Sequence, residues 1–205
     1  MIRVLVVTGG IGSGKSEVCR LLKDKGLVFQ YDADRRAKAL YGEYPELVEA
    51  METALHADLK DGDGRFVPAL LAEIIFSDGA ALKIVEELLF PVLMRDFERF
   101  LSDVPSGQTV VFESATILEK NYFDGFGDYV LLVDAPVSLR LSRACARDNA
   151  SMKQIRDRMD NQTLLNEISD GAACPRADHI ILNDGTLGDL EQKVSDFLND
   201  KFILI

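Results

Sequence analysis

Eight residues near the N-terminus have a spacing that suits phosphate chemistry. The stretch from Gly9 to Ser16 matches the pattern G-x-x-x-x-G-K-[ST] and stands between an apolar run and an expected helix. Its glycines let backbone N–H groups approach phosphate oxygens, and the N-terminus of the helix adds partial positive charge. We expect Lys15 to reach the β- and γ-phosphates of ATP and Ser16 to offer its hydroxyl to Mg²⁺. The residues expected to hold the nucleotide here are Gly10, Gly12, Ser13, Gly14, Lys15, Ser16 and Glu17.

A pair of carboxylates follows the second expected strand. Asp32 and Asp34, in "DAD", stand where open α/β sheets place their ligands, at the carboxyl end of a strand. A carboxylate there can accept or orient the proton of an acceptor hydroxyl, and we assign that role to Asp32. For Asp34 the alternative is the N-cap of the helix that starts at residue 35, because Asp is favoured there.

Three arginines repeat on one face of an expected helix. Arg140, Arg143 and Arg147 are spaced i, i+3 and i+7, and planar guanidinium groups suit polyphosphate. We expect Arg143 and Arg147 to stabilise the transferred phosphoryl group and Arg140 to contact the nucleotide; the alternative is a solvated face with local salt bridges. Arg158 and Gln162, spaced i and i+4, suggest a polar helix that closes over the nucleotide as a lid.

The phosphate loop alone does not identify the reaction. A GTPase needs an N/T-K-x-D segment, and "LNDG" at 182–185 lacks the lysine. A motor or transporter ATPase needs an apolar strand that ends in Asp beside a catalytic Glu; "VLLVD" at 130–134 is followed closely by Pro136. Together with the short chain, these differences favour a small-molecule kinase.

Composition limits the partners and the compartment. The 205 residues carry a net charge of −11, which argues against general binding to nucleic acid. Three cysteines without a C-x-x-C pair indicate neither a disulfide framework nor a zinc site. The apolar run near the N-terminus is too short for a signal sequence or a membrane span, so we expect a cytoplasmic protein with no membrane partner.

Apolar periodicity predicts alternating strands and helices. The expected strands are 3–8, 27–31, 108–114, 128–136 and 178–184, and the expected helices are 15–25, 47–55, 67–76, 82–101 (interrupted at Pro91), 137–148, 151–169 and one from 187. This order predicts an α/β fold, a P-loop parallel sheet flanked by helices, with a helical insertion and a helical lid.

The whole chain resembles the dephospho-CoA kinase family, whose enzymes complete coenzyme A biosynthesis. "TGGIGSGKS" (8–16) and "DAD" (32–34) resemble its phosphate loop and its acceptor-site motif. Further segments are similar in the same order along the chain, namely "DGRFVPALLAEIIF" (63–76), "LLFPVL" (88–93), "ESATILE" (113–119), "RLSRACARD" (140–148), "RMDNQ" (158–162) and "ADHIILNDG" (177–185).

The resemblance implies transfer of the γ-phosphate of ATP to the ribose 3′-hydroxyl of dephospho-CoA, with Mg²⁺ and with Asp32 as base. It also implies that Asp34, Arg65 and Glu113 contact the acceptor and that Asn183 lies beside adenine. The implied parts of a single kinase unit, 1–205, are a nucleotide-binding core of 1–34, 104–148 and 170–205, a CoA-side subdomain of 35–103 and a lid of 149–169. We expect a monomer or a weak homo-oligomer.

Departures from the family pattern fall on the acceptor side. Phe90 stands where many members have His, Pro68 where many have Arg, and Ala115–Thr116 where most have Pro-Leu. Arg65 lies close enough in sequence to replace the missing Arg. Two other functions therefore stay open, a kinase of another nucleoside or nucleotide and an ATP-binding sensor without catalysis.

Overall fold

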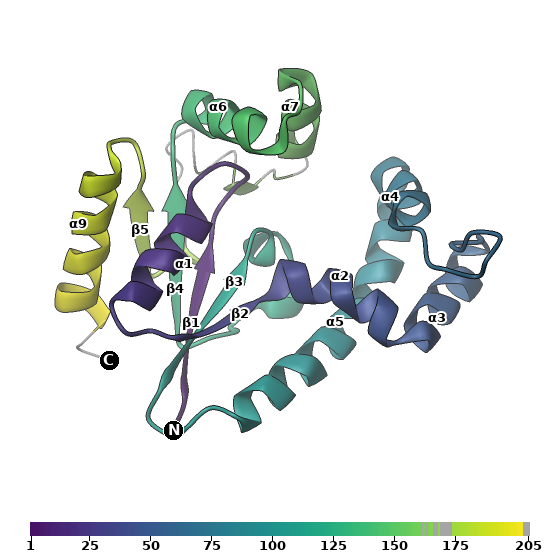
Figure 1. Cartoon of the computed structure of the whole chain (residues 1–205), viewed down its shortest axis with the longest axis horizontal. Coiled ribbons are helices and arrows are strands. Elements are labelled where there is room, and N and C mark those ends of the chain that lie inside the picture. The colour runs from purple at the N-terminus through teal and green to yellow at the C-terminus, as the bar shows by residue number, and fades with distance from the viewer. Residues whose placement is uncertain (161, 163, 166–167, 169–173, 203–205) are drawn as a thin grey trace. The chain divides into compact units, whose positions relative to one another are not determined.

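The computed structural model describes residues 1–160, 162, 164–165, 168 and 174–202 (Figure 1). The chain forms two compact units, one of Met1–Asp32 with Val104–Ile205 and one of Ala33–Asp103. Within the described residues, no helix has the length and apolar character needed to cross a membrane.

The first unit is built on a five-stranded parallel sheet in the order β2-β3-β1-β4-β5. The strands are β1 (Arg3–Thr8), β2 (Phe29–Asp32), β3 (Thr109–Ser114), β4 (Tyr129–Asp134) and β5 (His179–Leu182). Apolar residues dominate the central strands because parallel strands are covered on both faces. The predicted α/β fold is confirmed.

Helices α1 (Lys15–Asp24) and α9 (Leu187–Phe197) cover one face of this sheet. In α1 the buried Val18, Leu21 and Leu22 recur at i, i+3 and i+4, which gives the helix one apolar side. A reciprocal pair of hydrogen bonds between Thr186 and Asp189 caps the start of α9. A short π-helical turn at Leu198–Phe202 follows α9. The buried side chains of α1 hold the start of this helix, and with it the phosphate loop, against the sheet.

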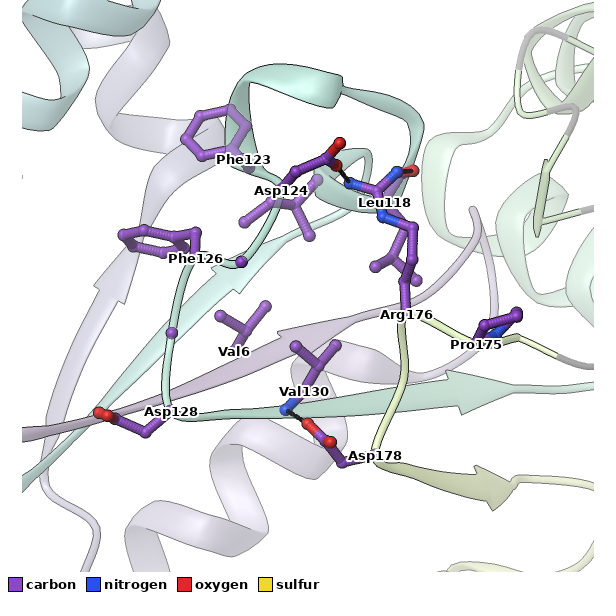
Figure 2. A pocket seen from close by; sticks show the side chains of 13 residues that line it. Val6, Leu118, Phe123, Asp124, Phe126, Asp128, Val130, Pro175, Arg176 and Asp178 are labelled. Atoms are coloured by element: carbon purple, nitrogen blue, oxygen red, sulfur yellow. Dashed lines mark hydrogen bonds and ion pairs between the residues drawn. The ribbon is translucent and has the colours of Figure 1, made fainter.

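The segment between β3 and β4 lies over the opposite face. It contains the 3₁₀ turns η1 (Ile117–Glu119) and η2 (Asn121–Phe123), and Phe126 packs edge-on against Phe112 of β3. A pocket of about 460 Å³ opens here, with Val6 and Val130 among its lining residues (Figure 2). Arg176 binds the carboxylate of Asp124 beside this pocket, so its charge is already paired.

Helices α6 (Val137–Asp148) and α7 (Met152–Asp160) pack on each other through a small apolar cluster in the same unit. The cluster consists of Leu141, Ala144, Ile155 and Met159, with Ile11 of the phosphate loop packed against it. The expected helix 151–169 thus begins as predicted, and most of its second half lies outside the described residues.

The second unit is helical and consists of α2 (Ala33–Glu43), α3 (Pro45–Leu55), α4 (Pro68–Ser77) and α5 (Gly79–Ser102). Pro45 and Pro68 occupy first helical positions, where the missing N–H costs no hydrogen bond. The expected interruption at Pro91 was wrong, because α5 continues through it. Buried Leu89 and Leu93 flank the proline, and the packing of α5 against α2, α3 and α4 offsets the lost hydrogen bond.

Candidate active site

The phosphate loop joins β1 to α1. Gly12 and Gly14 have φ of 77° and 97°, a region that favours glycine, and Gly14 is the N-cap of α1. Both also lie against other elements. A Cβ atom on Gly12 would overlap the backbone carbonyl of Arg140, and one on Gly14 would overlap the side-chain amide of Asn183. The loop is therefore shaped by close approach of α6 and of the segment after β5.

The last two residues of the motif meet a carboxylate from β3. Ser16 Oγ donates a 2.7 Å hydrogen bond to Glu113 Oε1, and Lys15 Nζ lies 3.2 Å from the same oxygen. Asp32, the last residue of β2, is paired in register with Glu113. The structure thus brings together a cation, a hydroxyl and two carboxylate residues at the carboxyl edge of the sheet, where parallel sheets place ligands.

Cys19 lies buried beside this cluster. Burial raises the pKa of its thiol well above the usual range, and the negative charge of Glu113 raises it further. Because only the thiolate is a strong nucleophile, Cys19 acts as a small apolar group packed in the core beside the site.

Arg140 does not lie on an exposed face. Its side chain is 1% exposed, and its Nε donates a 3.1 Å hydrogen bond to the carbonyl of Ile11. Gly10 has no side chain at the point where the guanidinium approaches, and a Cβ atom there would overlap it. Burial lowers the pKa of Arg140, and the charge of Asp134 acts in the opposite direction. The structure places Arg140 against the phosphate loop, where its charge adds to the potential felt by an anion.

Asn183, directly after β5, also holds the loop. Its Nδ2 donates a 2.8 Å hydrogen bond to the carbonyl of Ser13, and Arg143 Nη1 donates a 3.0 Å bond to the carbonyl of Asn183. Asn183 and Ser13 are both buried. The hydroxyl of Ser13 has no hydrogen-bond partner in the described residues. Arg143, Asn183 and Ser13 therefore form a continuous chain of contacts from α6 to the loop.

The side chains of Arg147 and Glu17, both expected to contact the nucleotide, bind oppositely charged neighbours. Arg147 donates to Asp148 from Nε at 2.7 Å and from Nη2 at 3.1 Å, and Asp148 also accepts from Arg158 at 3.1 Å. Glu17 lies in the first turn of α1 and pairs with Arg20, whose Nη2 is 2.6 Å from Glu17 Oε1. Arg147 is exposed, so its carboxylate partner can be exchanged for phosphate.

Gln162 is a contact residue that sequence reasoning placed on a lid. It is 3% exposed, and its Oε1 accepts a 2.9 Å hydrogen bond from the backbone N–H of Ile11. Its spacing from Arg158 indicated a polar helix face, but spacing carries no signal for a contact with a residue 151 positions earlier.

The remaining candidate residues lie in the second unit. Asp34 is in the first turn of α2, and Arg65 is exposed in a loop closed by the bridge between Lys60 and Phe66. Arg65 Nη1 lies 3.4 Å from Asp63, and its backbone N–H donates to Asp61 Oδ1 at 2.9 Å.

The first unit has the features of the P-loop kinases: a glycine-rich loop between a parallel strand and a helix, with carboxylates on the neighbouring strands. Within that class, the dephospho-CoA kinase family model matches residues 3–189, and the chain belongs to this family.

Relatives of similar sequence belong to the same family. The chain is 38% identical to dephospho-CoA kinase from Porphyromonas gingivalis over 177 residues, covering 86% of this chain and 84% of the relative. It is 33% identical to dephospho-CoA kinase from Salinibacter ruber over 193 residues, covering 94% of each.

Solved structures support the same fold. The structure of TT1252 from Thermus thermophilus matches with a TM-score of 0.80 and 29% identity, covering 97% of each chain. Dephospho-CoA kinase from Campylobacter jejuni matches with a TM-score of 0.63 and 23% identity, covering 98% of this chain and 97% of that one. At that identity the second likeness speaks for the fold alone.

Proposed function

We propose that this protein transfers the γ-phosphoryl group of ATP to the ribose 3′-hydroxyl of dephospho-CoA, giving coenzyme A and ADP. The observation that carries the proposal is the cluster of Lys15, Ser16 and Glu113, with Asp32 in register on the adjacent strand. A phosphate loop alone binds nucleotides, whereas a carboxylate beside it can also serve an acceptor hydroxyl. Family membership supports the identity of the acceptor.

Each of these residues has its own role in phosphoryl transfer. The loop amides and Lys15 hold the phosphates and stabilise charge on the γ-phosphoryl group, because such a transfer depends mainly on positioning and electrostatics. Asp32 accepts or orients the proton of the 3′-hydroxyl. Arg143 and Arg147 stabilise the leaving ADP, and for Arg147 this requires release from Asp148.

The oxygen donors near the loop suit Mg²⁺. No group of three or more His, Cys, Asp or Glu side chains in the described residues could hold a metal ion without help. Mg²⁺ usually takes only one or two protein oxygens and completes its shell with phosphates and water, so the hydroxyl of Ser16 beside Glu113 fits it. When bound, the ion would neutralise charge on the β- and γ-phosphates.

We assign the binding of the acceptor to residues of the helical unit. Asp34 and Arg65 are its proposed contacts in that unit, and Glu113 the contact from the sheet. The parts 1–34, 104–148 and 170–205 would form the nucleotide core, 35–103 the acceptor side and 149–169 the lid. We further propose a cytoplasmic monomer or weak homo-oligomer without nucleic-acid or membrane partners.

ADP release with a panel of acceptors tests the function. Purified protein with Mg²⁺-ATP is expected to form ADP with dephospho-CoA and not with adenosine or shikimate, and phosphorus NMR of the product is expected to show a 3′-phosphate. Tight ATP binding with no turnover on any acceptor would favour a sensor. Turnover on another nucleoside alone would favour a different kinase.

The role of Asp32 is tested separately. Asp32→Asn is expected to lower kcat about 100-fold or more with dephospho-CoA, while ATP affinity changes little. Near-normal kcat in a folded variant would exclude Asp32 as the base.

A further inference from the structure

Ile11, within the phosphate loop, is held from three sides. Its N–H donates to Gln162 Oε1 at 2.9 Å, and its carbonyl accepts from Arg140 Nε at 3.1 Å. Its side chain packs against the apolar cluster shared by α6 and α7. The peptide groups on both sides of Ile11 are thereby fixed by residues distant in sequence.

Gln162 connects three elements through one buried amide. Besides the bond from Ile11, its Oε1 accepts a long hydrogen bond from Arg140 Nη2 at 3.5 Å. Its Nε2 donates to the carbonyl of Ala115, after β3, at 3.4 Å. A side-chain amide offers both an acceptor and a donor, whereas a carboxylate offers only acceptors. Glutamine therefore suits all three neighbours.

The residues that follow Gln162 are fastened to the same loop after β3. The backbone N–H groups of Leu164 and Leu165 donate to the carboxylate of Glu119 at 3.3 and 3.1 Å. Both the side chain of Gln162 and the backbone just after it are thus tied to the segment Ala115–Glu119. These contacts fix where Gln162 stands relative to Ile11.

We propose that Gln162 is a positioning residue for the phosphate loop. By accepting from Ile11 and from Arg140, it keeps the loop and the buried guanidinium in the arrangement that receives the phosphates of ATP, without touching ATP itself. A loop already held in its bound shape costs less to order on binding. Without Gln162, the partly buried N–H of Ile11 loses its acceptor and the loop relaxes to recover one. The proposal rests on ATP binding at this loop, and not on the identity of the acceptor.

Two variants separate this role from general stability. Gln162→Met keeps the size of the side chain but removes its acceptor and donor. We expect it to raise both the Kd of ATP, measured by calorimetry, and the KM for ATP about tenfold. The KM for dephospho-CoA is expected to stay within about twofold of the wild-type value. Gln162→Glu keeps the oxygen acceptor and is expected to retain ATP affinity within about threefold.

Hydrogen exchange provides a readout that needs no activity. The amide of Ile11 is expected to exchange faster in Gln162→Met than in the wild type, in the absence of ATP. Gln192→Met, on the exposed side of α9, is the matched control and is expected to leave the Ile11 amide and ATP affinity unchanged. Should Gln162→Met not fold, Gln162→Asn replaces it, because the shorter amide cannot reach Ile11.

The proposal is overturned by any of three results: a wild-type Kd for ATP in Gln162→Met or its Asn replacement, an equal rise in KM for both substrates, or Gln162→Glu as weak as the methionine variant. Because calorimetry and exchange use ATP or no ligand, an error in the assigned acceptor would leave these measurements intact.

Discussion

The side chain of Asn183 donates a 2.8 Å hydrogen bond to the carbonyl of Ser13, 170 residues earlier in the chain. A Cβ atom on Gly14, the residue after Ser13, would lie 2.2 Å from the same amide nitrogen. The phosphate loop therefore takes its shape partly from Asn183, directly after β5. A side chain at position 14 would push the loop and Asn183 apart.

Gly14→Ala is expected to abolish measurable ATP binding. The new Cβ would overlap the amide of Asn183, and φ of 97° is strained for alanine. Calorimetric titration with Mg²⁺-ATP checks this result. Gly188→Ala is the control because Gly188 lies in the first turn of α9, where a Cβ atom would make only an ordinary 3.7 Å contact with Thr186 Oγ1, so alanine there is expected to stabilise the fold by about 0.4–1 kcal/mol. Wild-type ATP affinity in Gly14→Ala would contradict the close contact.

Glu113 is expected to support catalysis through Lys15 and Ser16. Glu113→Gln keeps an oxygen for the hydroxyl of Ser16 but removes the charge opposite Lys15, and is expected to lower kcat/KM about tenfold. Glu113→Ala removes both contacts and is expected to lower it about 100-fold. The half-saturating Mg²⁺ concentration in steady-state assays is expected to rise in the same order.

Glu191→Gln serves as the matched control for these variants, since Glu191 is 58% exposed and lies 3.7 Å from Lys25. It is expected to show wild-type kinetics. Equal activity of wild type and Glu113→Ala would remove Glu113 from the site.

The strands and the parallel α/β class could be predicted from the sequence because the apolar runs that mark them are local. Four consecutive apolar residues, 4–7, form the middle of β1 just before the glycines, and α6 spans the predicted residues 137–148. The helix through Pro91 could not be predicted this way. Sequence patterns show that proline lacks an N–H and so favours a break in the helix. The packing that stabilises α5 before and after Pro91 comes from other helices, which the local sequence does not show.

The site, too, could be predicted from the sequence only in part. The spacing of the phosphate loop identified Lys15 and Ser16, since their function depends on neighbours in sequence. The stripe at Arg140, Arg143 and Arg147 identified the three charges but not the burial of Arg140. Arg140 is enclosed because Gly10 leaves room for it, and that match joins residues from opposite parts of the chain.

Cys19 is expected to resist alkylation although it lies beside the site. Its pKa is raised by burial and then by Glu113, so the thiol stays protonated at pH 8, where an ordinary cysteine begins to ionise. Iodoacetamide followed by peptide mass spectrometry is expected to show Cys19 labelled about 100-fold more slowly than in urea. Cys145 is only partly buried and provides the internal comparison. Equal labelling of both cysteines in the folded protein would refute the burial argument.

The contact of Asp148 with Arg147 and Arg158 is expected to make stability depend on pH. The hydrogen bond from Arg147 is the main cause that holds the pKa of Asp148 below its usual range. Because the folded-state pKa is the lower one, the contact stabilises the fold above the ordinary Asp pKa of about 3.9 and is lost as pH falls through the folded value. Asp148→Asn is therefore expected to lower Tm by about 1–2 °C at pH 6, since such exposed pairs contribute little.

The same difference in Tm is expected to shrink as pH falls below the ordinary Asp range and to vanish once the wild-type carboxylate is also protonated. Thermal melts followed by circular dichroism across this range provide the measurement. Asp200→Asn, on the exposed turn after α9, is expected to leave Tm unchanged over the same range. A Tm difference for Asp148→Asn that stays constant from pH 6 to the acid limit would show that the substitution acts through packing and not through charge.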